Sequence, residues 1–343
     1  MTLTSPVASV PASPPEDPTL ADLFHRAPEL YALLDPERLD ADDLPAPTDF
    51  EDGCTGGRGD SYRQAQENPA VRLRGIRALF TMASPGRVLS SWRPEHVLVD
   101  LLGGDGTLAR AVEMFTPPES RPTVLTSDLS AGMIRAAQQR ELPAIRQAAQ
   151  RLRLRDQTVD AVLLAYGTHH IPPADRPATA SEAFRVLRPG GSLVMHDFAE
   201  DSAVARWFAD VVDRYSHTGH DYPHFTEAEL QGLLTGAGFT DVTVQRMYDP
   251  LVLTALTRDD ARVCLGDHLR WMYGLTRVSR GNERSAALTT ADLAEGTFRH
   301  ALADRAPGQA IGQVSYERTG DGWRVEMPRV ALVASGRRGT END

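Results

Sequence analysis

The segment that most constrains the fold is Val97–Arg110, which reads VLVDLLGGDGTLAR. Its first residues are apolar and mostly β-branched up to Asp100, a pattern typical of a buried strand. A helical pattern begins at Thr107, after three glycines: Gly103, Gly104 and Gly106. A strand that ends in glycines and continues as a helix brings backbone N–H groups close to a ligand, and the helix N-terminus favours anionic groups. We therefore predict a ligand site at this turn.

A second strand, Thr123–Ser127, is followed by an acidic residue, Asp128. A carboxylate at that position can accept hydrogen bonds from both ribose hydroxyls of an adenosine-containing cofactor. The spacing Gly104-x-Gly106-x-x-Ala109 also satisfies the dinucleotide fingerprint, so a nicotinamide-dependent oxidoreductase is an alternative at this point. The two segments together predict a nucleoside cofactor at the edge of a parallel sheet.

Composition narrows the function classes. The net charge of −11 argues against nucleic acid as a partner, because phosphate binding needs clustered cations. With only Cys54 and Cys264, neither a disulfide framework nor a cysteine zinc site is expected. All 36 basic residues are arginine, which excludes lysine Schiff-base chemistry and the lysine that short-chain dehydrogenases require. Since no apolar stretch reaches transmembrane length, we expect a cytoplasmic protein without a membrane partner.

Between Pro94 and Tyr248 strand and helix patterns alternate, which predicts a parallel, doubly wound α/β sheet. The expected strands are Val97–Leu102, Thr123–Ser127, Val159–Ala165, Ser192–Asp197 and Asp241–Met247. The expected helices between them include Ser130–Arg140, Asp175–Leu187, Asp201–Tyr215 and Thr226–Gly236. The last of these has a capping pattern at Thr226 and Glu229 and a glycine stop at Gly238.

The flanking segments give the domain boundaries. Residues 1–18 are expected to be a disordered tail, and residues 19–93 a helical cap with helices at Thr19–Leu34 and Tyr62–Ala83. Residues 94–250 form the core, and residues 251–308 a helical insertion or lid with helices at Asp259–Arg277 and Thr290–Ala303. Residues 309–343 then supply a hairpin around Gly320–Gly322 and the final strand of the core.

The core resembles the class I S-adenosylmethionine-dependent methyltransferases over about Pro94–Met247 plus the final strand. The segments that carry the resemblance are VLVDLLGGDG, TSDLSAGMI, VDAVLLAYGTHHI, FTEAELQGLLTGAGF and above all AFRVLRPGGSLVMHDF. The resemblance implies a Rossmann-like seven-stranded sheet whose last strand is antiparallel. It also implies S-adenosylmethionine as the methyl donor and a small organic acceptor, with a role in secondary metabolism such as antibiotic biosynthesis.

The resemblance further implies which residues contact the cofactor: Asp100, Gly103, Gly104, Gly106, Asp128, Leu129, Ala149 and Tyr166. Asp128 would hold the ribose, and Asp100 would hold the glycine turn or pair with the amino group of the cofactor. Two positions depart from the family pattern, because Leu102 replaces a usual glycine and Ala148 replaces an aspartate that often contacts adenine. These departures motivate a further alternative, a non-catalytic nucleoside-binding protein.

The histidines are candidates for the chemistry. His169 and His170 follow the fourth strand, where this fold places substrates, and His217, His220 and His224 surround Asp221. We assign His169, His170 and His220 as candidate catalytic residues, since neutral histidine suits a general base, while a purely structural set is the alternative. The leading interpretation has no metal ligands.

A divalent metal is kept as an alternative cofactor. His169 or His170 together with His220 and Asp221 has the composition of a two-histidine, one-carboxylate triad. In order and spacing this set resembles methyltransferases that use a metal to bind a 2-oxo acid and stabilise its enolate before C-methylation.

The lid contains His268, Trp271, Met272 and Tyr273, which are expected to be core residues or, for Trp271 and Tyr273, the roof of a substrate pocket. Homodimer formation is left open.

Overall fold

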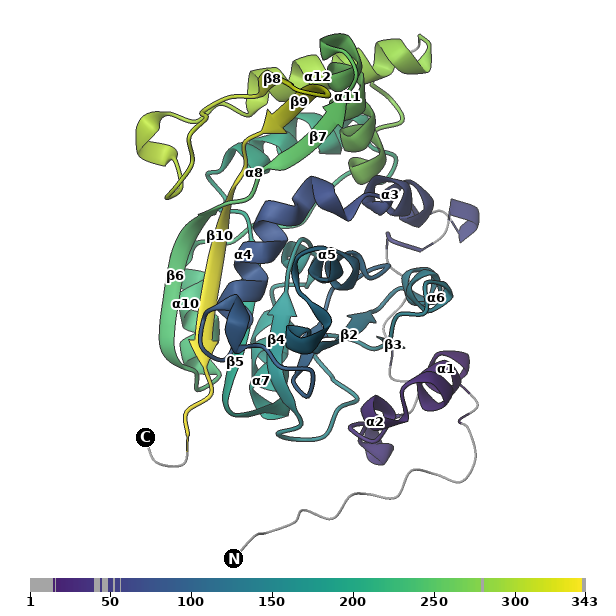
Figure 1. The fold of residues 1–343 in the computed structure, drawn as a ribbon, viewed down its shortest axis with the longest axis vertical. Helices are drawn as coiled ribbons and strands as arrows, with labels where there is room; N and C mark the ends of the chain where they lie inside the picture. The colour runs from purple at the N-terminus through teal and green to yellow at the C-terminus, as the bar shows by residue number, and fades with distance from the viewer. Residues whose placement is uncertain are drawn as a thin grey trace, which may run out of the picture.

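In the computed structural model, a seven-stranded sheet forms the centre of the molecule, with strand order β3-β2-β1-β4-β5-β10-β6 (Figure 1). The structure describes residues 15, 17–39, 44, 49–51, 53–55, 57–278 and 281–340. The expected disordered tail therefore lies almost entirely outside the described residues. The predicted fold class is confirmed, because β10 runs antiparallel to both of its neighbours in an otherwise parallel sheet.

The strands of the central sheet lie close to their predicted positions. They are β1 Val97–Asp100, β2 Thr123–Asp128, β3 Ala144–Arg146, β4 Val159–Leu164, β5 Leu187–Asp197, β6 Thr240–Tyr248 and β10 Val330–Arg337. The pattern analysis missed β3, which has only three residues. In β5, residues 188–191 bulge out of the ladder, since Val159 pairs with Leu187 and Ala161 already pairs with Ser192.

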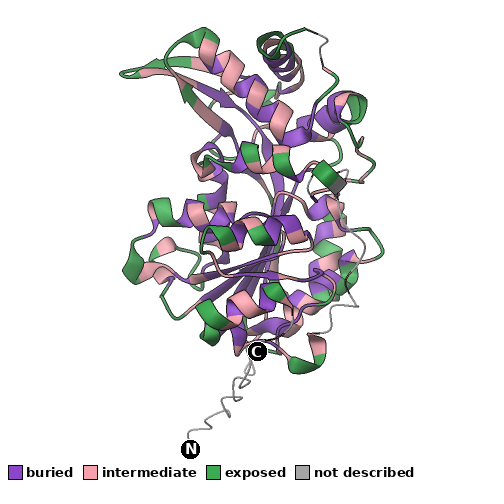
Figure 2. Ribbon diagram, turned by 90° about the vertical axis from the view of Figure 1, so that its right-hand side faces the viewer, coloured by how far each residue is buried: buried purple, intermediate pink, exposed green. Residues whose placement is uncertain are grey.

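Alternate residues of the strands pack into two cores on opposite faces of the sheet, as the strand period of two requires. Leu98 belongs to the core that also contains helices α4 and α5, whereas Val97 and Val99 belong to the core under α1, α7 and α10. Figure 2 shows the sheet buried between partly exposed helices. The helices are α1 Pro18–Arg26, α2 Pro28–Tyr31, α3 Gly59–Gln66, α4 Leu73–Ala83, α5 Thr107–Phe115, α6 Ala131–Gln139, α7 Arg176–Val186, α8 Ala203–Trp207, α9 Asp213–Tyr215, α10 Glu227–Gly236, α11 Arg258–Tyr273 and α12 Glu283–Thr297.

Proline interrupts both of the long helices expected near the N-terminus. The first breaks at Ala27, before Pro28, and the second has a short 3₁₀ turn at Pro69–Arg72 between α3 and α4. Proline lacks an N–H and disfavours helical geometry in the residue before it, so each predicted helix divides there.

Capping residues decide the ends of the lid helices. Helix α11 ends at Tyr273 rather than Arg277, because Gly274 adopts a left-handed conformation (φ 61°) that terminates the helix. Helix α12 begins at Glu283 rather than Thr290, since the side chain of Asn282 accepts a hydrogen bond from the backbone N–H of Ser285 and caps it. By contrast, the predicted cap of α10 is confirmed, with Thr226 Oγ1 accepting from the Glu229 N–H at 3.0 Å.

The hairpin at Gly320–Gly322 is confirmed, but it does not join the central sheet. Strands β8 (Ser315–Thr319) and β9 (Gly322–Met327) form a separate three-stranded sheet with β7 (Leu251–Ala255), in a segment for which helix alone was predicted. Strand β6 continues into β7, and β9 continues into β10, so one long antiparallel ribbon leaves the central sheet and becomes part of the second (Figure 1).

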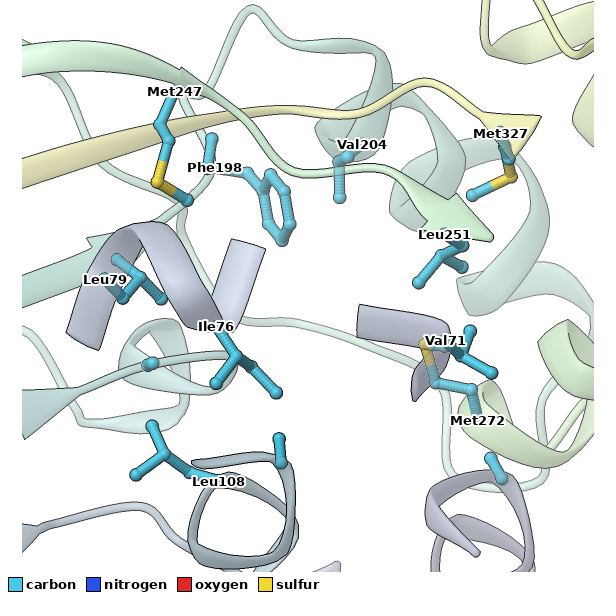
Figure 3. Close-up of a cluster of buried hydrophobic side chains, with 14 of the residues drawn as sticks. Val71, Ile76, Leu79, Leu108, Phe198, Val204, Met247, Leu251, Met272 and Met327 are labelled. Carbon is cyan, nitrogen blue, oxygen red and sulfur yellow. The ribbon is translucent and has the colours of Figure 1, made fainter. Parts of the chain in front are cut away.

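A continuous hydrophobic core joins the two sheets. Figure 3 shows Val71 and Ile76 of the N-terminal segment facing Leu251 of β7 and Met272 of α11, with Phe198 beyond the end of β5 nearby. The second sheet and its helices are thereby fixed over the C-terminal ends of the central strands. This arrangement closes the space above the strand ends from one side.

Candidate functional site

A cavity of about 360 Å³ lies at the C-terminal ends of β1, β2, β3 and β4. Drug-sized ligands occupy cavities of roughly 300–1,000 Å³, so this one is large enough for a nucleoside cofactor. Residues that follow each of the four strands line it, among them Leu102, Asp128, Ala149 and Tyr166. A cavity thus lies at the predicted position, the edge of a parallel sheet.

The glycine turn after β1 forms one wall. Gly103 packs so closely that a Cβ atom would lie 2.8 Å from both the Asp100 carboxylate and the Thr126 side chain. Gly104 has a φ of 55°, lines the cavity and donates its N–H to Asp128 Oδ2 at 3.0 Å. Gly106 (φ 83°) is the N-terminal cap of α5 and faces Leu142 rather than the cavity. The turn therefore needs glycine for its backbone shape and its close packing.

Asp128 is held in place by backbone groups. In addition to the Gly104 N–H, its Oδ1 accepts the Ser130 N–H at 2.9 Å. Burial raises the pKa of Asp128 to about 6, although these backbone hydrogen bonds oppose the rise. The carboxylate is ionised at pH 7.5 and lines the cavity, so it can accept hydrogen bonds from a ligand hydroxyl.

Asp100 lies beneath the glycine turn and is 3% exposed. Burial, together with the nearby Asp128, raises the pKa of Asp100 to about 8. Asp100 and Gly103 line a side cavity of about 30 Å³ instead of the main one. Of the predicted cofactor residues, the main cavity is lined by Gly104, Asp128, Leu129, Ala149 and Tyr166.

The opposite wall comes from residues that were not predicted from the sequence. Asp49, Phe50 and Tyr62 reach the cavity from the N-terminal segment, and Tyr222 from the loop after α9. The hydroxyl of Tyr222 donates to Asp49 Oδ2 at 3.1 Å, which ties the two segments together. No sequence signal marked these residues, because their function depends on segments that are distant in the chain.

Tyr166 follows β4 with a φ of 63°, an uncommon conformation for a residue with a side chain. Its hydroxyl donates to Asp249 Oδ1 at 3.1 Å, and its backbone N–H donates to His196 Nδ1 at 3.3 Å. The strained backbone is therefore fixed by buried partners on both sides, as is common where a side chain must be directed at a ligand.

Next to the cavity, four histidines form a cluster. The rings of His169 and His170 lie 4.4 Å apart, and those of His169 and His220 5.1 Å apart. His169, His170 and His220 each offer a ring nitrogen within 4.8 Å of the others, and His224 packs 4.9 Å from His169. His170 lines the cavity, whereas His169 and His220 lie behind it. The three predicted catalytic histidines are thus brought together.

Asp197, at the end of β5, organises this cluster and was not predicted. Its carboxylate oxygens lie 2.9 and 3.0 Å from His169 Nδ1, and Oδ1 lies 3.4 Å from His224 Nδ1. Although burial opposes ionisation, His169 and His224 hold the pKa of Asp197 well below its usual range. The Nε2 atoms of His169, His220 and His224 are left buried without a hydrogen-bond partner among the described residues.

Burial also keeps two of the histidines neutral. It lowers the pKa of His170 well below 6.5, with His169 and Arg58 adding to the effect, and it lowers the pKa of His220 to about 3. His217 and Asp221 are exposed, and Asp221 belongs to neither group of metal-ligating side chains within the described part of the chain. The described residues therefore do not assemble the two-histidine, one-carboxylate set with Asp221, because its carboxylate is not among the ligand atoms that converge there.

In the lid, Tyr273 and Met272 line a second small cavity, while His268 is buried in α11 and lines none of the described cavities. Trp271 packs against the core instead of forming a pocket roof.

The two positions that depart from the family pattern lie at or near the cavity. Leu102 lines the main cavity, and Ala148 is buried beside Ala149. None of the described helices is both long and apolar enough to span a bilayer.

The family comparison decides the class of the domain. Residues 99–195 match the family model described as a methyltransferase domain. The matched segment runs from β1 to β5 of the central sheet. It contains the glycine turn, Asp128 and the histidine pair after β4, so the resemblance to the class I S-adenosylmethionine-dependent methyltransferases is confirmed.

The curated relatives are quinone-biosynthesis enzymes by name. A demethylmenaquinone methyltransferase of Mycobacterium sp. (strain JLS) is 33% identical over 122 residues, covering 36% of this chain and 49% of the relative. A ubiquinone/menaquinone biosynthesis C-methyltransferase of Bordetella avium is 34% identical over 148 residues, covering 41% of this chain and 54% of the relative. The chain thus spans about half the length of the curated relatives it matches.

Among solved structures, a methyltransferase of Bacillus halodurans has a TM-score of 0.45 at 15% identity, with 77% of this chain and 99% of that chain covered. A Haemonchus contortus phosphoethanolamine N-methyltransferase in complex with S-adenosyl-L-methionine has a TM-score of 0.46 at 14% identity, with 83% and 60% covered.

Proposed function

We propose that the protein transfers the methyl group of S-adenosylmethionine to a small organic acceptor. The observation that carries this proposal is the cavity beside the glycine turn, with the Asp128 carboxylate directed into it from a segment of the methyltransferase family. In methyl transfer the acceptor atom displaces the sulfonium in line, so the protein must chiefly hold donor and acceptor in contact. A cavity lined from two sides, by the strand ends and by the N-terminal segment, suits that requirement.

Several residues have proposed roles. Asp128 would accept hydrogen bonds from the ribose hydroxyls, while the backbone at Gly104 and the side chains of Leu129 and Ala149 would surround the cofactor. His170 would take a proton from the acceptor, because it is neutral at pH 7 and lines the same cavity. Asp100 and Gly103 would shape the turn from beneath.

A calorimetric titration with S-adenosylmethionine, S-adenosylhomocysteine and NADH tests the cofactor. We expect micromolar binding of the first two and none of NADH. Asp128→Ala should weaken binding by about 10- to 100-fold, the value of charge-assisted hydrogen bonds at roughly 1.5–3 kcal/mol. Asp160→Asn is the matched control, since Asp160 accepts the Val97 N–H at the opposite end of the sheet. Binding of NADH alone would favour the oxidoreductase alternative, and no binding at all a non-catalytic scaffold.

A second candidate is metal-assisted methyl transfer, as in the C-methylation of a 2-oxo acid. The specific observation in its favour is the convergence of ring nitrogens from His169, His170 and His220, together with buried Nε2 atoms that lack partners. If Asp197 accepts the Nδ1–H of His169, the other ring nitrogen of His169 is free to face a metal, as in histidine metal sites where a carboxylate orients the ligating ring. A bound divalent ion would act as a Lewis acid on oxygen atoms of the acceptor.

Metal analysis of the purified protein distinguishes the two candidates. If the histidines hold a metal, the parent should contain about one iron, zinc or similar ion per chain, and His220→Ala should reduce that content and its affinity at least 10-fold. His217→Ala, in the same loop but exposed, serves as the control and should retain the metal. Full methyl transfer in the presence of chelator, with no bound metal, would leave the histidines as proton acceptors only. Secondary metabolism, a cytoplasmic location and homodimer formation stay predictions from the sequence.

A further inference from the structure

Two arginines beside the site lack an acidic partner. Arg72, at the end of the 3₁₀ turn before α4, is 5% exposed, and Arg58, just before α3, is half-buried. Within the described residues, neither guanidinium lies within 4.0 Å of a carboxylate, and Arg72 Nε is buried without a hydrogen-bond partner. A buried cation without a counter-charge is costly, so its presence calls for an explanation.

Aromatic rings and a backbone carbonyl surround these guanidinium groups. Arg58 Nη1 donates to the carbonyl of Met272 at 2.7 Å, and its guanidinium carbon lies 4.3 Å from the centre of the Phe50 ring. The guanidinium carbon of Arg72 lies 4.7 Å from the centre of the Tyr166 ring. The hydroxyl group of Tyr62 lies within hydrogen-bonding reach of the Arg72 side chain. Both side chains are thus held in position, and Arg72 Nε keeps an unused donor.

The other buried arginines of the chain are paired. Arg176 forms a 2.6 Å ion pair with Glu229, and Arg329 forms a 2.6 Å ion pair with Asp249. The charge of Asp49 acts on Arg58 and that of Asp249 on Arg72, in both cases from beyond ion-pair distance. Asp249 also accepts the hydroxyl of Tyr166. Among the fully buried arginines of the described residues, Arg72 is thus the one without an acidic partner.

The two guanidinium groups border one small cavity of about 30 Å³. Its described lining contains three arginines, the third being Arg329, and no acidic side chain. Phe50, Tyr62, Tyr166 and His170 line both this cavity and the main one, so the two spaces adjoin. A molecule whose anionic end lies between the arginines would extend past these aromatic rings toward the predicted cofactor site.

We infer that Arg58 and Arg72 bind the carboxylate of the methyl acceptor, and that the acceptor is an aromatic carboxylic acid. This inference rests on the proposed function and adds a substrate class to it. The planar guanidinium fork matches a carboxylate, and the rings of Phe50, Tyr62 and Tyr166 offer an apolar wall for an aromatic body. An incoming carboxylate would supply the missing counter-charge of both arginines.

Binding of matched probes to the full chain tests the inference. With the protein saturated in S-adenosylhomocysteine, phenylacetate, phenyl phosphate and the neutral phenylacetamide are titrated by calorimetry. We expect phenylacetate to bind at least 10-fold more tightly than phenylacetamide. Arg72→Met should abolish this preference without changing the affinity for S-adenosylhomocysteine more than 2-fold. Arg77→Met is the matched control, because Arg77 lies on the exposed side of α4 and should leave the preference intact.

Thermal unfolding of the unliganded variants separates ligand binding from a structural role. If Arg72 serves to bind a ligand, the unfolding temperature of Arg72→Met should equal or exceed that of the parent protein. The reason is that the substitution removes an unpaired buried charge. Equal affinity for phenylacetate and phenylacetamide, or a preference unchanged in Arg72→Met, would overturn the inference. Preferential binding of phenyl phosphate would replace carboxylate by phosphate and so also overturn it. Failure to bind S-adenosylhomocysteine would instead count against the proposed function.

Discussion

At the scale of single residues, two carboxylates at adjacent strand ends have different environments. Asp128 accepts two backbone N–H groups and lines the main cavity, whereas Asp100 lies beneath the turn, where burial dominates. Their mutual repulsion adds to the raised pKa of Asp100. The net charge of these two carboxylates therefore changes with pH near neutrality.

This difference predicts a pH dependence of stability. The pKa of Asp100 is about 8 in the folded protein, against 3.8 for an ordinary aspartate. Between these two pH values the folded state keeps a proton on Asp100 that the unfolded state has lost. The free energy of unfolding should then fall as the pH rises from about 4 to about 8. Asp100→Asn should flatten this dependence and stabilise the unliganded protein at pH 8 by about 1–3 kcal/mol.

Thermal unfolding from pH 4 to pH 8.5 measures the effect of Asp100→Asn. Asp210→Asn, at an exposed position, is the control and should follow the parent curve. A parent whose stability rises steadily over this pH range, or a variant with an unchanged slope, would contradict the assigned pKa.

At the scale of elements, the ribbon formed by β6–β7 and β9–β10 connects the two sheets. Pro250 and Pro328 interrupt the ladder where the ribbon leaves the central sheet, because proline has no N–H to donate. Asp249 and Arg329 lie at that break and pair through side chains and backbone, with Arg329 Nε donating to the Asp249 carbonyl at 2.9 Å. The pair thus replaces the interstrand hydrogen bonds that the prolines remove.

Removal of one partner should therefore be costly. Arg329→Met leaves the Asp249 carboxylate buried with one cation fewer, and we expect it to lower the free energy of unfolding by about 3–5 kcal/mol. Chemical denaturation measures the loss. Arg246→Met on β6 is the control, since its ion pairs are 3.9 Å long and partly exposed, and it should cost less than about 1 kcal/mol. Similar losses in the two variants would show that the Asp249–Arg329 pair does not hold the ribbon.

At the scale of the whole molecule, the core shown in Figure 3 is shared by the central sheet, the N-terminal helices and the second sheet. Segments as distant as Val71, Leu251 and Met327 contribute to it. Because the buried residues described in β7 and β9 belong to this same core, we expect the two layers to unfold as one cooperative unit.

Leu251→Ala tests this expectation. Leu251 is fully buried at the start of β7, so its truncation should cost about 2–5 kcal/mol. Far-ultraviolet circular dichroism and tryptophan fluorescence should report one coincident transition that shifts as a whole. Leu256→Ala, at a position that is 82% exposed, should change the stability by less than about 0.5 kcal/mol. A second transition confined to the variant would mean that the lid unfolds separately.

Local patterns predicted most of the central sheet. Long apolar runs such as Val159–Ala165 carry a strong strand signal, and the α10 cap carries a helix signal of its own. By contrast, Ala144–Arg146 is too short for a periodic pattern, and β7 becomes a strand only by pairing with β9. The predicted helix boundaries were wrong where a proline, Asn282 or Gly274 determines the end of the helix.

The sequence by itself determined the sheet, the glycine turn and the position of Asp128, because these depend on neighbouring residues and on the order of strands. The class of cofactor followed from the family resemblance of these segments. The tertiary structure alone decided which side chains share the site. Asp197, Tyr222 and the arginine pair reach it from segments that are distant in the chain, and their charge states follow from burial that only the packed fold creates. Asp221 shows the reverse case, since its spacing suggested a ligand but its side chain is exposed.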